Sequence, residues 1–353
     1  MSQQKQNQVR NRRRAREWSQ AELAARANIS RAAVSAIEGQ RLIPSVATAL
    51  SLARVMECSV EELFSTNLTE SPLKSTPRWA WPSSPQPARY WCGTVQGQLL
   101  FYPAEVTPLG EIPHDGFGLP ESNPSHLRRA NETLVIASCD PASGLLARLY
   151  ERTTGFRILV VQRSSWQALQ LLEQGLVHMA GVHFAATNDP KGNAASVRQL
   201  VSQPARLLRA ASWKAGVAVG SKIGTRSVRG LLNSQLKWIG REEGSGARRC
   251  QDELLHDRPA PRRTARDHRG VADAIRCGWA DAGVCLELVA REAGLKFIPI
   301  RTEEYDLCYQ RCNEDDPRVL TLLKVIQSSE YRQLYGELSG YDTRMTGENT
   351  LIT

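Results

Sequence analysis

One short string in the sequence combines residue types that can hold an anion. Residues 241–249 read Arg-Glu-Glu-Gly-Ser-Gly-Ala-Arg-Arg and follow the strand-like segment 237–239. A strand followed by Gly-Ser-Gly and a helix directs free backbone N–H groups and the positive helix end at one point. We predict an anion site here, although such a string is also common as a plain tight turn. Its candidate ligand residues are Arg241, Ser245, Gly246 and Arg248.

Two further turns carry serine in the same kind of place. Ser138 and Asp140 follow the apolar segment 134–137, and Ser164 and Ser165 follow the apolar segment 158–161. Each turn precedes a helix-like segment, so each is expected at the carboxyl end of a strand, where α/β proteins bind ligands. Three serine-bearing turns suit an oxyanion held by neutral donors, or a carboxylate ligand.

The histidines are expected to have different roles. His178 and His183 flank the apolar strand that we predict within 177–182, and their spacing of five residues puts them on opposite faces. A shared metal is therefore not expected, and we predict no metal site. We assign His183 to the ligand cleft and His178 to a structural role, while His268 either lines the cleft or lies on the surface. The 8 cysteines form no CxxC pair and are expected to be free thiols.

A second kind of chemistry is predicted near the N-terminus, in residues 18–39. Ser19 is placed to cap a helix whose third residue is Glu22, and Ser30 is placed to cap a second helix. Asn28, in the short turn between them, tolerates the left-handed conformation that such a turn requires. The expected contacts between the two helices come from Leu23, Ala24, Ile29, Val34 and Ile37.

The elements that position these residues fall into three parts of the 353-residue chain. Residues 4–66 are predicted to form a compact helical domain. Residues 67–130 are predicted to be a Pro-rich linker, and its aromatic residues indicate that part of it docks on a folded surface. Residues 131–342 alternate short apolar runs with helical segments, which predicts parallel strands in an α/β domain. The fold class is thus an all-α N-terminal domain followed by an α/β domain.

Residues 9–64 resemble the helix-turn-helix domain of the Cro/phage-repressor family, also called the xenobiotic response element family. The resemblance implies that the second helix enters the major groove of DNA, with Arg31, Ala32, Ser35 and Ala36 as its candidate contacts. It also implies that Gln20 contacts a phosphate. Arg12, Arg13 and Arg41 are expected to hold the DNA backbone.

Segments between about 130 and 310 resemble, in order, the periplasmic-binding-protein-like domain that is fused to helix-turn-helix domains in bacterial regulators and is related to molybdate-binding proteins. This resemblance implies two α/β lobes that close on a ligand, and a C-terminal helix near 317–338 that crosses back over the first lobe. It adds Tyr305 to the candidate ligand residues. Ala247 stands where the family pattern has threonine, which removes one hydroxyl.

These observations favour a ligand-responsive DNA-binding regulator without catalytic residues. The net charge of +9 fits a polyanionic partner, here a double-stranded DNA operator, and a homodimer is expected on a two-fold operator. The favoured effector is molybdate or tungstate, with a small organic acid bound by Arg241 and Arg248 as the alternative. A DNA-tethered enzyme using Cys139 with His183 or His268, and a scaffold that only dimerises, remain open. With neither a membrane span nor a secretory signal in the sequence, we expect a cytoplasmic protein.

Overall fold

The computed structural model describes residues 8–39, 41–58, 60–64, 77–82, 88–107, 110, 112–118, 124–184, 192–225, 227–256 and 258–352. The chain divides into two compact units, Met1–Pro72 and Leu73–Thr353. Among the described residues, no helix has both the length and the apolar character needed to cross a membrane.

The described part of the first unit is helical. The predicted capping box is present, because Ser19 Oγ accepts the N–H of Glu22 while the Glu22 carboxylate accepts the N–H of Ser19. Asn28 ends the first helix of the motif in the left-handed conformation, and Ser30 caps the next helix. The five helices found here are α1 (Val9–Ala15), α2 (Gln20–Ala27), α3 (Arg31–Glu38), α4 (Val46–Val55) and α5 (Val60–Phe64).

The second unit begins with a small sheet. It has the strand order β1-β3-β2-β4, with β1 (Arg78–Trp79), β2 (Ala88–Val95), β3 (Gln98–Pro103) and β4 (Gly116–Gly118), and α6 (Pro124–Asn131) contacts β2. The interval 67–130, predicted as a partly docked linker, therefore contains this sheet and most of α6, while 67–76 lies outside the described residues. Buried aromatic side chains explain the difference: Trp91 and Tyr102 lie in a core shared with the main sheet, and the Tyr102 hydroxyl donates to the Leu176 carbonyl over 2.7 Å.

The main sheet has the order β10-β9-β11-β8-β12-β7-β5-β6, with β13 and β14 also paired to β8. The first lobe contains β5 (Thr133–Ser138), β6 (Arg157–Gln162), β7 (Met179–Val182), α7 (Ser143–Thr154), α8 (Ser165–Glu173), α9 (Gly192–Leu200), α14 (Pro317–Gln327) and α15 (Ser329–Gly336). The second lobe contains β9 (Trp238–Arg241), β10 (Thr264–Ala265), β11 (Ala282–Leu286), α10 (Val228–Leu232), α11 (Gly246–Leu254), α12 (His268–Arg276) and α13 (Glu287–Glu292).

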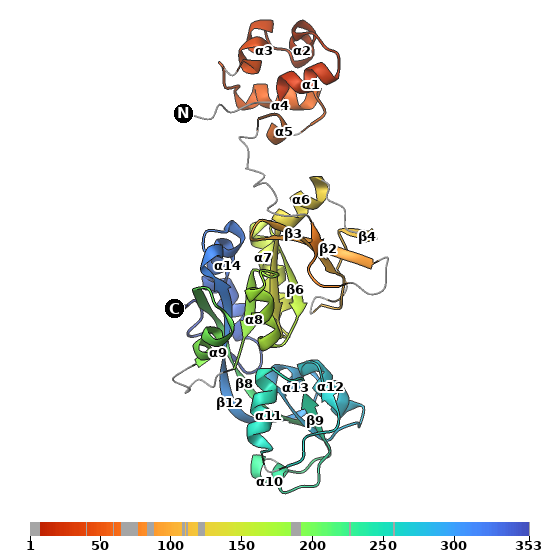
Figure 1. Ribbon diagram of the computed structural model, residues 1–353, viewed down its shortest axis with the longest axis vertical. Coiled ribbons are helices and arrows are strands. Elements are labelled where there is room, and N and C mark those ends of the chain that lie inside the picture. Colours follow the sequence, from red (N-terminus) through yellow and green to blue (C-terminus); the bar gives the residue numbers. More distant parts are fainter. Residues whose placement is uncertain are drawn as a thin grey trace. The chain divides into compact units, whose positions relative to one another are not determined.

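Two long antiparallel strands, β8 (Ala205–Val219) and β12 (Lys296–Gln310), run through both lobes (Figure 1). The register between them shifts at Pro299/Arg301 and at Tyr305/Asp306. On one side of these shifts β8 also pairs with β11 of the second lobe, and on the other side β12 also pairs with β7 of the first lobe. Such irregularities bend a strand pair. The bends therefore lie where the strand pair passes from one lobe to the other.

Two expectations from the sequence differ from this architecture. Strands β5, β6 and β9 are parallel to their neighbours as expected, whereas β7 is parallel to β5 but antiparallel to β12. The runs at 217–219 and 297–300 belong to β8 and β12, which are antiparallel. A short run buried on both faces is apolar whichever way its neighbours run, so composition could not reveal the direction. The α/β domain also extends past residue 342, because β14 (Asn349–Ile352) pairs with β8, as does β13 (Tyr341–Asp342).

Candidate functional site

The two lobes meet around a narrow pocket. The Trp166 N–H donates to the Gly244 carbonyl over 3.3 Å, and the Gln167 amide donates to Glu242 over 3.2 Å, so the contact between lobes is direct. The pocket has about 10 Å³ of free volume, which is room for roughly one water molecule. The lobes are therefore in a closed arrangement. The pocket is lined by Cys139, Gln162, Arg163, Ser164, Arg241, Glu242, Ser245, Arg266 and Asp267.

A buried chain of polar groups lies beside this pocket. Cys139 Sγ is 3.0 Å from Nε2 of His183, and Nδ1 of His183 is 3.0 Å from a carboxylate oxygen of Glu303. Burial by itself lowers the pKa of His183, but the thiol and the carboxylate outweigh it and raise this pKa to about 10. Burial likewise opposes ionisation of Glu303, yet His183 and Arg301 keep its pKa below the usual value. The pair is therefore stable as imidazolium and carboxylate.

Arg241 is a buried cation with little compensation. Its side chain comes from the end of β9 and is only 1% exposed. Nη1 donates to Nδ1 of His268 over 2.9 Å and approaches the Val284 carbonyl at 3.4 Å, while Nε has no partner among the described residues. Burial lowers the pKa of this guanidinium from its usual value. A buried charge without a hydrogen-bonded counter-charge is costly, so this position favours an incoming anion.

His268 is the first residue of α12 and is 2% exposed. Burial and the neighbouring Arg241 hold its pKa well below the ordinary value, so the ring is neutral. Because Nδ1 accepts from Arg241, the single ring proton is on Nε2, and this atom is buried without a partner among the described residues.

The predicted serine-bearing turns are present, but most of their hydroxyls are engaged. Ser164 and Ser245 line the pocket, and each hydroxyl also accepts an N–H from the first turn of its own helix. The Ser165 hydroxyl accepts the N–H of His183 over 3.2 Å. The Ser138 hydroxyl is 2.7 Å from the hydroxyl of Tyr305. These serines stabilise the turns, and Ser165 also holds the segment after β7 that begins at His183, here called the histidine loop.

Other predicted ligand residues lie behind the pocket or away from it. The buried Asp140 accepts from the Tyr341 hydroxyl over 2.6 Å, and burial raises its pKa to about 6. Tyr305 is buried and stacks on Trp213 with ring centroids 4.5 Å apart. Arg248 does not line the pocket, because its side chain, 30% exposed, pairs with Asp252 over 2.7 Å. For these residues the structure gives a supporting role rather than contact with the pocket.

Gly246 is needed for close packing between the lobes. A Cβ at this position would lie 2.1 Å from the His183 carbonyl oxygen and 2.7 Å from its Nδ1. The first turn of α11 therefore packs directly on the histidine loop. This is a packing role, whereas the sequence suggested a ligand contact.

Sequence reasoning missed several pocket residues: Gln162, Arg163, Glu242, Arg266 and Asp267. Cys139 was considered only as a possible nucleophile. Asp267 carried a usable signal, because its side chain caps α12 and so marks another strand-to-helix turn. Arg163 could also have been identified from its position, because it directly precedes Ser164 and Ser165 in the turn after β6.

In the first unit, some of the predicted DNA-contacting side chains are at least partly exposed, while Arg13 and Gln20 form hydrogen bonds with Glu38. On α3, Arg31 and Ala32 are exposed, and Ser35 and Ala36 are half-buried; Arg12 is half-buried and Arg41 exposed. Arg13 differs from expectation, since its Nε donates over 2.5 Å to the buried carboxylate of Glu38. The Gln20 amide also donates to Glu38, over 2.9 Å. The guanidinium of Arg13, which was expected to contact the DNA backbone, therefore forms an ion pair inside the domain.

Comparisons with known proteins agree with both family resemblances. Residues 146–327 match the PBP superfamily domain, and residues 9–63 match the helix-turn-helix family. The chain is 28% identical over 231 residues to the uncharacterized protein YvgK of Bacillus subtilis (strain 168), which covers 62% of this chain and 74% of YvgK. It is 28% identical over 82 residues to an uncharacterized protein in the ferredoxin 2Fe-2S gene 5' region of Clostridium pasteurianum, covering 23% and 73% of the two chains. A putative phosphate ABC transporter substrate-binding protein with bound phosphate from Clostridium perfringens aligns with a TM-score of 0.49 and 11% identity, over 58% of this chain and 97% of that one.

Proposed function

The chain belongs to the PBP superfamily, and from this premise we propose that it is a DNA-binding transcriptional regulator whose C-terminal domain senses a small anion between its lobes. The helix-turn-helix domain supplies the DNA-binding half of this proposal. As a homodimer it would read a two-fold operator in the cytoplasm, with Arg31, Ala32, Ser35 and Ala36 toward the bases and Arg12, Arg41 and Gln20 toward the backbone.

The observation that carries the anion is the buried Arg241. This guanidinium is 1% exposed and donates to a neutral imidazole, and within the described part of the chain its Nε has no partner and no carboxylate is hydrogen-bonded to it. Arg163 and Arg266 add two more cations to the pocket lining, against Glu242 and Asp267. An anion that replaces the imidazole as the partner of Arg241 would satisfy this charge through charge-assisted hydrogen bonds.

For the effector class we favour a molybdate- or tungstate-type oxyanion. Its support is the family resemblance together with the serine-capped turns of α8 and α11, both of which line the pocket through Ser164 and Ser245. A small organic acid is the second candidate, because a planar guanidinium binds a carboxylate through two parallel hydrogen bonds. The narrow pocket implies that the lobes open to admit either ligand.

The test is thermal unfolding of the full chain against molybdate, tungstate, sulfate, phosphate and small carboxylates. A ligand present at 100 times its dissociation constant stabilises the folded state by about 2.7 kcal/mol, and we expect such a shift for one class of anion. Arg241→Gln should abolish the response, whereas Arg248→Gln, at the position outside the pocket, should keep it. Equal responses of the two variants, or no response of the wild-type chain to any anion, would refute the assignment.

A further inference from the structure

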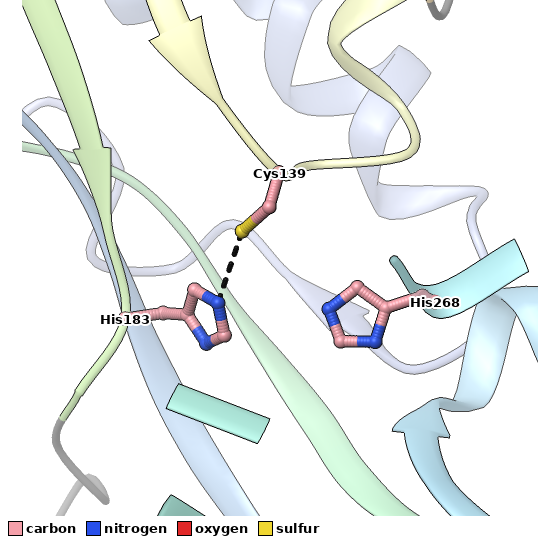
Figure 2. Close-up of side chains that lie close together, drawn as sticks. All are labelled: Cys139, His183 and His268. Atoms are coloured by element: carbon pink, nitrogen blue, oxygen red, sulfur yellow. Dashed lines mark hydrogen bonds between the residues drawn. The ribbon is translucent and has the colours of Figure 1, made fainter. Parts of the chain in front are cut away.

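Three metal-ligating side chains converge at the lobe interface. Cys139 follows β5, His183 follows β7 and His268 begins α12, so the first two belong to the first lobe and the third to the second lobe. One ligand atom from each lies within 4.8 Å of the others, and all three residues are buried. Figure 2 shows that a nitrogen of each imidazole and the sulfur point toward a common centre.

The donor types specify a class of ion. A thiolate with two imidazoles matches the preferences of Zn²⁺ and similar borderline transition-metal ions, and does not suit Mg²⁺ or Ca²⁺, which prefer oxygen. A tetrahedral Zn²⁺ site keeps its ligand atoms about 3.3 to 3.6 Å apart. Cys139 Sγ and His183 Nε2 are 3.0 Å apart, slightly closer than in such a site. All the ligand atoms of the three residues lie within 4.8 Å of one another, which is somewhat farther than in such a site. Side-chain adjustments of well under 2 Å therefore bring the three atoms to coordination distance.

His183 is already oriented as a metal ligand. Its Nδ1 faces the Glu303 carboxylate at 3.0 Å, which leaves Nε2 directed at the centre of the cluster. Without a metal ion the ring is an imidazolium, so a bound ion must displace the proton on Nε2. Carboxylates in this position fix the tautomer of metal-bound histidines and raise their basicity. Glu303 is itself held by the indole N–H of Trp213, at 3.2 Å, and by Arg301.

His268 has a buried ring nitrogen that is free to rearrange, because it carries a proton in the closed arrangement and donates it to no described residue. Its Nε2 is buried and unpartnered among the described residues, although the residue is 2% exposed. In this closed arrangement Nδ1 accepts from Arg241. Coordination through Nε2 requires the ring proton to be on Nδ1 instead, so Arg241 must turn away from the ring, toward the Val284 carbonyl or a bound anion.

We propose that Cys139, His183 and His268 form a binding site for a Zn²⁺-type transition-metal ion that links the two lobes. The site goes beyond the proposed anion sensing, because its ligands are different side chains and the ion is a cation. Two ligands come from one lobe and one from the other, so the bound ion stabilises the closed arrangement. A fourth coordination position remains for water or an anion, as in zinc sites with three protein ligands.

Cobalt titration of the full chain, reduced with a non-thiol reductant, tests this site. Co²⁺ replaces Zn²⁺ in such sites and gives an intense sulfur-to-metal charge-transfer absorption when thiolate is bound. We expect saturation at one equivalent, loss of the absorption on adding Zn²⁺, and loss of the absorption in Cys139→Ser. The matched control is Cys277→Ser, which removes an exposed thiol and should leave the titration unchanged. An absorption that survives in Cys139→Ser, or no uptake by the wild-type chain, would overturn the proposal.

Two further variants keep the test decisive if Cys139→Ser fails to fold. His268→Gln should weaken cobalt binding at least tenfold while the charge-transfer absorption remains at high cobalt; unchanged affinity would remove His268 from the site. Arg241→Gln offers an amide oxygen that accepts the Nδ1–H of His268, so it should tighten cobalt binding even as it abolishes the anion response. A weakening equal to that of His268→Gln would contradict coordination through Nε2. The metal site and the anion site thus fail or succeed separately.

Discussion

Arg241 and His268 illustrate how much of the pocket could be predicted from individual residues in the sequence. Arg241, Ser164 and Ser245 were predicted from their places after strands, and all three line the pocket. The partner of Arg241 was not predictable, because His268 lies 27 residues away and only the folding of α12 against β9 brings the two together. Residue type and local position therefore indicated which residues lie at the pocket, while the pairing required the tertiary structure.

Gly246 allows a specific test of close packing between the lobes. In Gly246→Ala the added Cβ meets backbone at 2.1 Å, and backbone cannot rotate away as a side-chain end can. Overpacking of this kind costs about 1–3 kcal/mol, so we expect the melting temperature of the second unit to fall by about 2–10 °C. Gly224→Ala is the control, since a Cβ there meets nothing within 4 Å. Equal melting temperatures of the two variants would show that the lobes do not pack as described.

His178, to which the sequence analysis assigned a structural role, is a buried neutral histidine. Its Nδ1 accepts the Val135 N–H and its Nε2 contacts the Thr94 carbonyl, both at 2.9 Å. Burial is the main cause that lowers its pKa to about 3. The positive charge of Arg318 lowers this pKa further, and the negative charge of Asp316 opposes the shift. The unfolded chain therefore takes up a proton near pH 6.5 that the folded chain refuses until about pH 3.

The sign of this shift predicts acid destabilisation. The contribution of His178 to stability is complete above pH 6.5 and decreases by about 1.4 kcal/mol per pH unit below it. Asp140, with its pKa raised to about 6, acts in the opposite direction, so the comparison must be between two chains that share it. Denaturant unfolding of the wild type and of His178→Gln between pH 7 and pH 4 should show a steeper loss in the wild type. Parallel curves would mean that His178 is protonated in the folded state.

At the level of elements, the helices of the first unit were predictable because their signals are local. Ser19 with Glu22, Asn28, and Ser30 mark the ends of α2 and α3 within a few residues in sequence, and each is found in the expected conformation. The direction of β8 and β12 was not predictable. It depends on which strands lie beside them, and even the nearest pair between β8 and β12, Val219 with Lys296, is 77 residues apart in the sequence.

The pairing of α1 with α3 provides a prediction at this scale. Glu38 on α3 is buried and accepts hydrogen bonds from Arg13 on α1 and Gln20 on α2. In Glu38→Gln the guanidinium of Arg13 loses its counter-charge, which we expect to destabilise the first unit by about 1–3 kcal/mol. Faster hydrogen exchange in peptides from α1 to α3 would report this loss. Glu22→Gln, which keeps the capping box, should leave exchange close to that of the wild type.

For the whole molecule, the order of domains could be predicted, but the small sheet over 78–118 could not. The prolines in and around it indicate a linker when read one by one, while Trp91 and Tyr102 indicate burial only once the main sheet is present to receive them. The same dependence applies to the lobes. Their closure brings together residues from four separate turns, and the arrangement of those turns is a property of β8 and β12 rather than of any single segment.

Coupling between the pocket and DNA is the prediction that belongs to the complete chain. If the anion binds one lobe arrangement 100-fold better than another, it biases the equilibrium by about 2.7 kcal/mol, enough to change operator affinity up to 100-fold. The measurement is the dissociation constant for an operator selected from random duplexes, with and without the anion. Arg241→Gln should bind the same operator without responding to the anion, and Arg31→Ala should lose operator binding while keeping the thermal response. Since coupling is reciprocal, the operator must change anion affinity by the same factor. An anion that binds the wild-type chain and leaves operator affinity unchanged would separate the two halves of the molecule and refute a sensor role.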